Sequence, residues 1–148
     1  YNNKTSVSIY DSLGASHILN SYYEKTADNA WDVHVEVDNT AIGTGSLSFN
    51  TDGSFNSQAG LTGLTYNPGG GATAGQVLNV GMSDVSQYGS ATAIHKISAD
   101  GHTSGTPGNV NIDNDGLVSV VYSNGKIEKV AQVAVARFES PQGLYSNG

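Results

Sequence analysis

Cysteine is absent from the 148 residues of this sequence. Its absence excludes disulfide bonds, thiolate catalysis and zinc sites that depend on cysteine ligands. It fits a protein that is exported unfolded across a membrane, and it fits many cytosolic proteins equally well. The absence of cysteine therefore excludes these kinds of site but does not indicate the cellular compartment of the protein.

Basic residues are also scarce, with 6 Lys and Arg against 13 Asp and Glu, which gives a formal net charge of −7. Nucleic-acid binding depends on clustered Lys and Arg side chains, and anionic membrane surfaces attract the same residues. No apolar stretch approaches the length of about 18 residues that a transmembrane helix needs. We therefore predict neither a nucleic-acid partner nor a membrane partner.

Glycine and small polar residues take the place of the missing charged side chains. The chain has 19 Gly, only 13% of its residues are charged, and Ser, Thr and Asn are abundant. Many short strands joined by tight turns use residues in this way. The length suits one domain, or one and a part. The sequence begins at Tyr1 without Met or a signal-peptide pattern, so we interpret it as a piece of a longer protein.

The clearest strand pattern covers residues 31–38, where apolar and polar residues alternate strictly. Such alternation indicates a strand with one buried face and one solvated face. The residues predicted to be buried are Trp31, Val33, Val35 and Val37. Upstream, residues 6–11 and 17–25 flank a short turn and resemble a hairpin. The first 38 residues therefore predict a three-stranded antiparallel meander.

The remainder of the chain also favours short strands over helices. Further strands are predicted, in chain order, at residues 47–49, around 55, and at 76–82, 92–98, 117–122 and 127–138. Four Asp-Gly or Asn-Gly dipeptides mark turns. Residues 66–76 read as a glycine-rich loop, and residues 98–109 as a corner or boundary. We predict an all-β fold, an antiparallel sandwich or partly open barrel of short strands with tight Asp-Gly and Asn-Gly turns.

One stretch has part of the spacing of a calcium-binding EF-hand loop. Asn111, Asp113, Asp115 and Gly116 stand at positions 1, 3, 5 and 6, but position 12 is Tyr122 instead of the bidentate carboxylate. Helices should flank such a loop, whereas a β-branched run follows here. The pattern favours a turn between two strands, and we predict no metal-binding residue.

No constellation of side chains predicts catalysis. The four histidines have no ligand spacing, so each is interpreted as a solvated or packed side chain; they are His17, His34, His95 and His102. No Gly-x-Ser-x-Gly elbow is present, and most acidic residues lie in predicted turns. A triad assembled from distant residues is not forbidden by the sequence, but nothing in it favours one. We predict no catalytic residue, no cofactor and no enzymatic activity.

Aromatic residues raise the alternative of a sugar-binding surface. The chain has 8 Tyr and 1 Trp. However, the neighbours Tyr22 and Tyr23 must point to opposite faces of a strand, so their rings cannot form one platform. Two other classes of function therefore stay open as alternatives: a secreted carbohydrate- or calcium-binding β-sandwich module, and a β-sandwich hydrolase with a cleft that the sequence does not reveal.

Six segments, in chain order, resemble the bacterial flagellar hook protein family. They read YNNKTSVSIYDSLGASHIL, YYEKTADNAWDVHVEV, LSFNTDGSF, SQYGS, ADGHTSGTPGNVNIDNDGLVSVVYSNGK and AQVAVARFESPQGL. The first contains the family's Tyr-Asp-Ser-x-Gly pattern followed by x-His, and the fifth contains Ile-Asp-x-Asp-Gly and Tyr-Ser-Asn-Gly. The likeness is weakest between residues 60 and 83. Ala131 stands where the family usually has Gly, and Val135 where it usually has Leu.

The resemblance implies an architectural protein. Hook proteins assemble helically into a short curved tube that joins the flagellar rod to the filament and transmits torque as a universal joint. The implied partners are copies of the full-length chain in a helical polymer, together with flagellar rod, cap and hook–filament junction proteins. The implied location is the extracellular flagellum, reached through the flagellar secretion apparatus.

The resemblance also implies a division of the chain near Gly101–His102, where the turn-rich composition independently indicates a corner. Residues 1–101 would form an outer β domain. Residues 102–148 would form closing strands that return towards the adjacent inner domain, unless residues 1–148 make one continuous β unit. The helical ends of hook proteins are not recognisable in this sequence. Because identical net-negative domains repel each other, we expect the isolated fragment to be a monomer.

Overall fold

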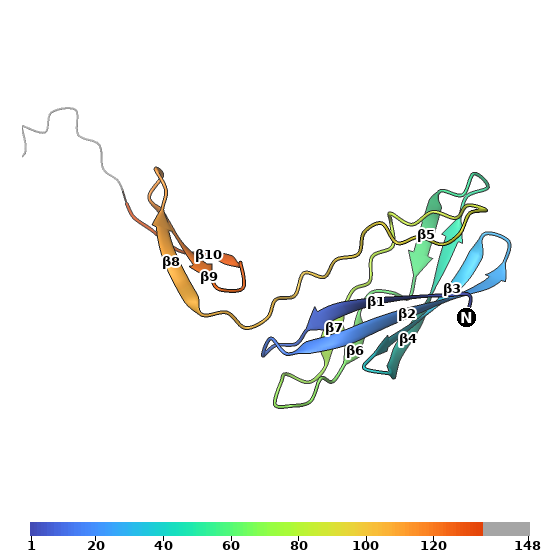
Figure 1. Ribbon diagram of the computed structural model, residues 1–148, viewed down its shortest axis with the longest axis horizontal. Helices are drawn as coiled ribbons and strands as arrows, with labels where there is room; N and C mark the ends of the chain where they lie inside the picture. The colour runs from blue at the N-terminus through green and yellow to red at the C-terminus, as the bar shows by residue number, and fades with distance from the viewer. Residues whose placement is uncertain (135–148) are drawn as a thin grey trace, which may run out of the picture. The chain divides into compact units, whose positions relative to one another are not determined.

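The computed structural model describes residues 1–134, which form ten strands and no helix (Figure 1). The chain divides into two compact units, residues Tyr1–Ser104 and Gly105–Gly148, which are called unit 1 and unit 2 below. All strand pairs in both units are antiparallel. The predicted all-β, antiparallel fold class is confirmed. Within residues 1–134, no helix could cross a membrane.

Unit 1 is built on a five-stranded sheet in which each strand pairs with its neighbour in the chain. The strands are β1 (Asn3–Tyr10), β2 (Ser16–Ala27), β3 (Ala30–Val37), β4 (Thr40–Phe49) and β5 (Phe55–Ala59). The predicted meander of three strands is confirmed, and two more strands continue it. A two-residue turn joins β3 to β4, with φ of 48° at Asp38 and 65° at Asn39. Positive φ at both positions is the geometry of a type I′ turn, which matches the twist of the strands that it connects.

The alternation predicted for β3 gives the centre of the hydrophobic core. Val33 and Val35 are 0% exposed and Val37 is 4% exposed. Trp31, at the start of the strand, packs against the same core and is half-buried. The residues of β3 between them point to the opposite, solvated face of the sheet. The predicted buried face is therefore confirmed.

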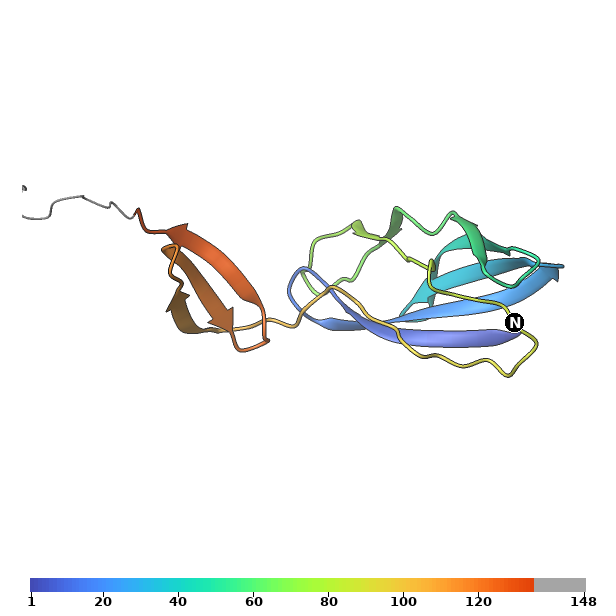
Figure 2. The same ribbon diagram turned by 90° about the horizontal axis from the view of Figure 1, so that it is seen from above.

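A second layer covers the core face of the sheet. It contains the two-stranded sheet of β6 (Leu64–Tyr66) and β7 (Gln76–Leu78) and lies on one side of the main sheet (Figure 2, green). Its buried residues join the core cluster of the main sheet; they are Leu61, Leu64, Tyr66 and Met82. Strand β7 lies within the predicted strand at 76–82, whereas β6 was not predicted.

Two glycines of β4 let this second layer approach the sheet closely. A Cβ atom on Gly43 would collide with the end of the Leu64 side chain. A Cβ atom on Gly45 would lie 2.5 Å from Leu61 Cγ and 2.5 Å from the carbonyl oxygen of Ala59. Each glycine therefore leaves a slot in the sheet that a leucine fills.

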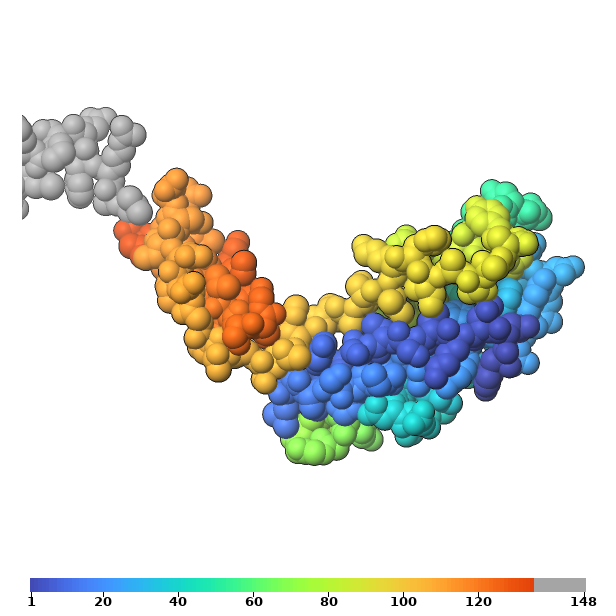
Figure 3. Space-filling view, viewed as in Figure 1, coloured from blue at the N-terminus to red at the C-terminus, as the bar shows by residue number. Residues whose placement is uncertain are grey.

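Residues 83–104 complete unit 1 without forming a strand, and they lie along the N-terminal strands on its surface (Figure 3, yellow beside blue). The Trp31 Nε1–H donates to Gln87 Oε1 over 2.5 Å, and the Gln87 backbone N–H donates to the Gly53 carbonyl over 2.8 Å. Further along, the Thr92 hydroxyl donates to Asn3 Oδ1 over 3.0 Å. Side-chain and isolated backbone hydrogen bonds therefore attach this segment to the sheet.

The prediction of a strand at residues 92–98 is wrong. Its two large apolar residues, Ile94 and Ile97, are 55% and 47% exposed. They are three positions apart, so in a strand they would point to opposite faces and could not share one core. Asp100–Gly101 is not a hairpin turn either. Gly101 instead allows close approach to Tyr10, whose backbone nitrogen would lie 3.3 Å from an added Cβ.

Unit 2 contains a three-stranded antiparallel sheet in the order β10-β9-β8. The strands are β8 (Pro107–Ile112), β9 (Leu117–Tyr122) and β10 (Ile127–Gln132). The turns predicted at Asp115–Gly116 and Asn124–Gly125 are confirmed, with φ of 76° and 82° at the two glycines. The strand predicted at 127–138 begins as expected, and its residues 135–138 lie outside the described residues.

Candidate functional site

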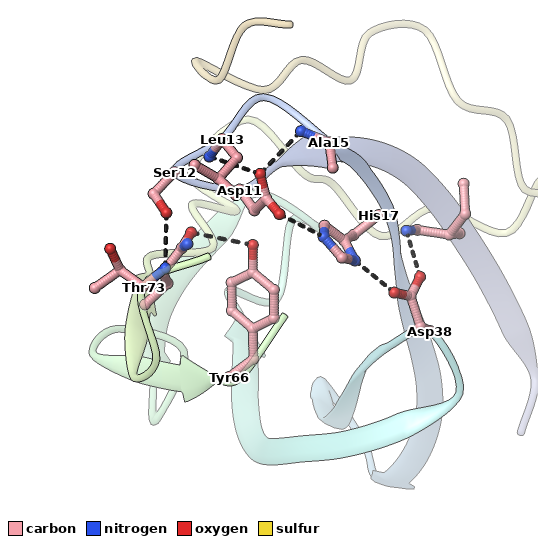
Figure 4. Close-up of polar contacts among 10 residues, drawn as sticks. Asp11, Ser12, Leu13, Ala15, His17, Asp38, Tyr66 and Thr73 are labelled. Atoms are coloured by element: carbon pink, nitrogen blue, oxygen red, sulfur yellow. Dashed lines mark hydrogen bonds and ion pairs between the residues drawn. The ribbon is translucent and has the colours of Figure 1, made fainter. Parts of the chain in front are cut away.

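In unit 1, a histidine is held between two aspartates (Figure 4). His17 lies on β2 directly after the β1–β2 turn. Its Nδ1 is 2.6 Å from Asp38 Oδ2, and its Nε2 is 3.3 Å from Asp11 Oδ2. The side chains of His17 and Asp11 are only 11% and 4% exposed, whereas that of Asp38 is 52% exposed. We call these three residues the His17 cluster.

Asp11 is fixed by the turn between β1 and β2. Its Oδ1 accepts hydrogen bonds from the backbone N–H groups of Leu13 and Ala15, each over 2.8 Å. The Asp11 carbonyl accepts a further bond from the N–H of Gly14, which has a φ of 80°. This is the way in which aspartate typically stabilises a tight turn. The turn thereby directs the other carboxylate oxygen towards His17.

Asp38 is fixed by the type I′ turn between β3 and β4. Its Oδ1 accepts the Ile18 N–H over 2.9 Å, and its own N–H donates to the Ile18 carbonyl over 3.0 Å. Both bonds tie the turn to β2, next to His17. The sheet register therefore brings Asp38 to the imidazole although the two residues are 21 positions apart.

The second layer of unit 1 closes the cluster from another side. The Tyr66 ring of β6 meets the His17 ring edge to face, with centroids 5.8 Å apart. The Tyr66 hydroxyl donates to Gln76 Oε1 over 3.3 Å. The Ser12 hydroxyl accepts the Thr73 N–H over 2.8 Å (Figure 4). Three connections of the chain therefore meet here: the β1–β2 turn, the β3–β4 turn and the β6–β7 hairpin.

The arrangement shifts the pKa of each group in a consistent direction. The hydrogen bond that the His17 ring donates to the Asp38 carboxylate raises the pKa of His17, burial opposes the shift, and the bond to Asp11 adds to it. The Ile18 N–H and then His17 lower the pKa of Asp38. Burial works to raise the pKa of Asp11, but its hydrogen bonds outweigh burial and lower that pKa overall. Burial raises the pKa of Tyr66, and the two aspartates contribute to this shift. The charged forms of the imidazole and both carboxylates are therefore favoured.

The geometry of the His17 cluster supports a structural role. Both ring nitrogens of His17 face carboxylates, so neither is directed at a substrate. The nearest hydroxyl on the same turn, that of Ser12, accepts a bond from the backbone of Thr73. In the described part of the chain, no three His, Cys, Asp or Glu side chains are grouped to hold a metal ion. The cluster connects chain segments.

The other histidines lie apart from the cluster. His34 lies on the solvated face of β3, where its Nδ1 is 3.1 Å from the Thr44 hydroxyl. Its Nε2 is 3.6 Å from Glu24, which is too long for a hydrogen bond. His95 and His102 are exposed in the segment without strands. The interpretation of packed or solvated histidines describes these three, but it missed the two aspartates that hold His17.

The stretch with partial EF-hand spacing forms the turn between β8 and β9. Asp113 Oδ1 accepts the N–H groups of Asp115 and Leu117, each over 2.9 Å, and the Asp113 carbonyl accepts the Gly116 N–H. The Asp113 carboxylate thus stabilises the turn from within. A turn between two strands is what the sequence predicted for this stretch.

Tyr22 and Tyr23 point to opposite faces of β2, as predicted. Tyr23 packs against the core, and its hydroxyl is 3.6 Å from Met82 Sδ. Tyr22 lies on the solvated face, where Lys4 Nζ is 5.1 Å from its ring centroid and the Tyr1 ring is 5.0 Å away. The two tyrosines therefore do not form one aromatic platform.

Comparison with known proteins relates the whole chain to flagellar proteins. Residues 1–102 match the family described as the flagellar basal body protein FlaE D2 domain. Flagellar hook protein FlgE of Salmonella typhimurium is 32% identical over 154 aligned residues, which cover 100% of this chain and 38% of that protein. FlgE of Rhizobium meliloti is 32% identical, with 95% of this chain and 36% of that protein covered.

The fold has a counterpart among solved structures. The crystal structure of Helicobacter pylori flagellar hook protein FlgE2 matches with a TM-score of 0.62 and 21% identity, over 99% of this chain and 35% of that chain. The chain spans little more than a third of the length of these relatives. Because the family match covers more than half of its residues, the chain belongs to the FlaE D2 domain family of flagellar basal body proteins.

Proposed function

We propose that this chain is a structural segment of a flagellar hook protein, and that its parent protein polymerises into the hook and helps to transmit torque from rod to filament. The observation that carries this proposal is the alignment of the entire chain with proteins named flagellar hook protein FlgE, together with the family match over residues 1–102. Under this proposal, the partners are copies of the full-length chain and neighbouring flagellar proteins. The location is outside the cell, after export through the flagellar apparatus.

The polar face of the unit 1 sheet supports a role in an assembly whose subunits move past each other. The face is rich in small hydroxyl side chains, several of which bond within the sheet. Ser48 and Ser57 share a hydrogen bond of 2.7 Å, and the Ser6 hydroxyl donates to Asn20 Oδ1 over 2.7 Å. Small polar contacts can be broken and remade at lower cost than large apolar ones. Such a face suits the sliding of neighbouring domains in a universal joint.

A role without catalysis agrees with the surface of unit 1. One hollow of unit 1 is shallow and lies on the polar face, lined by Asp32, Thr44, Gly45, Ser46, Ala59 and Gly60. Asp32 is the one titratable side chain in this lining, so the hollow holds no pair of a general acid and a base, or of a nucleophile and a base. The hollow therefore supports the proposal that the chain is not an enzyme.

For the division of the chain, we propose that residues 1–101 form the outer domain and that residues 102–148 belong with the adjacent inner domain. Apolar side chains of unit 2 are strongly exposed in this chain, with Val110 at 60%, Ile112 at 64% and Ile127 at 65%. The register places Val110 beside Val120 and Ile112 beside Val118, which makes one apolar face, whereas Ile127 lies beside Val121 on the opposite face. Three strands gain independent stability when such a face is packed. Other parts of the parent protein would supply that packing.

Electron microscopy tests the proposed function. The 148-residue chain and the same chain within its natural flanking sequence are compared under assembly conditions. We expect curved tubes from the long chain and dispersed particles from the fragment, since the drive to polymerise would lie in the flanking segments. A long chain that stays dispersed would contradict the proposal. Sedimentation of the fragment at micromolar concentration should show a monomer, and a stable dimer would oppose that part of it.

A further inference from the structure

The geometry of the His17 cluster favours a protonated imidazole. Nδ1 is 2.6 Å from one carboxylate oxygen and Nε2 is 3.3 Å from another. A neutral imidazole has a single N–H, so it can donate to one of these carboxylates only. Its second nitrogen would then direct a lone pair at the other carboxylate. Both contacts are favourable at once only in the imidazolium form.

The titratable groups that face His17 come from each element packed against it. They are Asp11 from the β1–β2 turn, Asp38 from the β3–β4 turn and Tyr66 from β6. Each carboxylate uses its remaining oxygen to accept backbone N–H groups, which favours the ionised form. The Tyr66 hydroxyl is directed at Gln76. The imidazolium is therefore the charge that offsets two neighbouring anions.

The same turn also supports the last residues of unit 1. Gly14 packs so closely against this segment that an added Cβ would lie 2.9 Å from the Thr103 carbonyl carbon. On the neighbouring strand, Tyr10 packs against Gly101. Loosening the β1–β2 turn would therefore also loosen residues 101–104, the segment that precedes unit 2.

We propose that His17 is a protonation-dependent latch: its imidazolium fastens the β1–β2 turn and the β3–β4 turn to each other beneath Tyr66, and loss of its proton releases this end of unit 1. The inference concerns the domain itself and does not depend on the polymer that its parent forms. It assigns a physical role to Asp11 and His17, neither of which lines the hollow described above.

The direction of the pH dependence follows from the pKa shifts. The pKa of His17 is raised above its ordinary value of 6.5. The latch is therefore fully formed below pH 6.5 and is lost as the pH rises through the pKa of His17 in the folded chain. The pKa values of Asp11 and Asp38 are lowered from 3.8, so their contribution is present above 3.8 and disappears only at more acidic pH. The latch thus operates in mildly acidic solution and opens as the pH rises through the pKa of His17 in the folded chain.

The test is an NMR titration of the 148-residue chain. The ring signals of His17 are followed with pH, together with hydrogen exchange at the amides of Ala15 and Ile18, corrected for intrinsic exchange. We expect both ring nitrogens to be protonated at pH 6, and a His17 midpoint above 6.5. Exchange at the two amides should accelerate with the same midpoint by about 2- to 10-fold, the range for loss of one hydrogen bond. This measurement needs no substitution.

Variants sharpen the test. Asp38→Asn should lower the His17 midpoint, because it removes one of the two anions. His17→Gln should abolish the pH-dependent step in exchange at both amides. His34→Gln is the matched control, since His34 also lies beside a carboxylate, and it should leave that step unchanged. A His17 ring that is neutral at pH 6, or turn amides that do not respond as His17 titrates, would overturn the proposal.

Discussion

The glycine slots of β4 give a prediction in which the sign of the change in stability decides whether the glycines have a steric role. Gly45 has an ordinary negative or extended φ, since it is absent from the positive-φ residues, so alanine could adopt the same backbone. If the glycine had no steric role, Gly45→Ala would stabilise unit 1 by about 0.4–1 kcal/mol through the entropy of the unfolded chain. However, the new Cβ would lie 2.5 Å from the Ala59 carbonyl oxygen and 2.6 Å from Leu61 Cδ2. Overpacking of this kind typically costs about 1–3 kcal/mol.

Because one of the colliding atoms belongs to the backbone, Gly45→Ala cannot be relieved by a change of rotamer alone. We therefore expect a net loss of roughly 1–2 kcal/mol, the difference between the overpacking and entropy effects. At about 4–8 °C per kcal/mol for a domain of this size, the Tm of unit 1 should fall by about 5–15 °C. Gly43→Ala should cost less, since the atoms it meets belong to the end of the Leu64 side chain.

Thermal denaturation followed by circular dichroism, with urea denaturation as a second measurement, checks this order of stabilities. Gly81→Ala is the matched control, because an added Cβ there meets nothing within 4 Å and its φ is not positive. It should leave the Tm unchanged or raise it slightly. If Gly45→Ala raised the Tm, or behaved like Gly81→Ala, the interpretation of a slot filled by leucine would be refuted.

Three further substitutions, with Leu13→Ala as the exposed control for the first, test the core, a turn and the segment attached to Trp31. Leu61→Ala should destabilise unit 1 by about 2–5 kcal/mol in urea denaturation, because the Leu61 side chain is 1% exposed. Leu13 is 58% exposed, so Leu13→Ala should change the stability by no more than about 0.5 kcal/mol. Asn39→Val should lower the stability of unit 1 by roughly 1–2 kcal/mol in a thermal melt, because φ at residue 39 is 65°. Equal stability of the variant and the original chain would contradict the type I′ turn between β3 and β4. Trp31→Phe removes the donor to Gln87, so hydrogen exchange at the Gln87 amide should accelerate by about 2- to 10-fold, and unchanged exchange would show that this bond does not hold the segment.

The parts of the fold that sequence analysis predicted correctly are those that depend on neighbours in the chain. The buried face of β3 follows from alternation alone, and the turns of unit 2 follow from dipeptides that accept positive φ. In β4, the two glycines at 43 and 45 weaken the strand pattern, so the sequence predicted a strand only from residue 47. These glycines are needed because Leu61 and Leu64 of the second layer pack directly against them. Such a contact has no local signature.

The His17 cluster escaped prediction for a related reason. Asp11 is close in sequence to His17, but the segment Tyr10–His17 indicates only a hairpin turn and a family pattern. Asp38 reaches the imidazole through the combined registers of β2, β3 and the turn that follows, and periodicity does not fix these registers to one residue. A search for acidic turn residues at the same end of adjacent strands would have suggested the triplet. The sequence predicted the meander, but it placed Asp38 inside the strand at 31–38 instead of in the turn that follows β3.

The order of strands in unit 1 has a consequence for the way this domain forms. Each of β2 to β5 pairs with the strand that precedes it, so the sheet can grow by successive hairpins that close short loops. A chain that emerges progressively from its N-terminal side can therefore form the sheet before residues 61–82 have emerged. Until then, the second layer does not cover the valines of β3, and the partly folded domain exposes an apolar surface. Folding would thus end when Leu61 and Leu64 pack against Gly45 and Gly43. This late step would cover the apolar surface that makes the unfinished domain prone to aggregate.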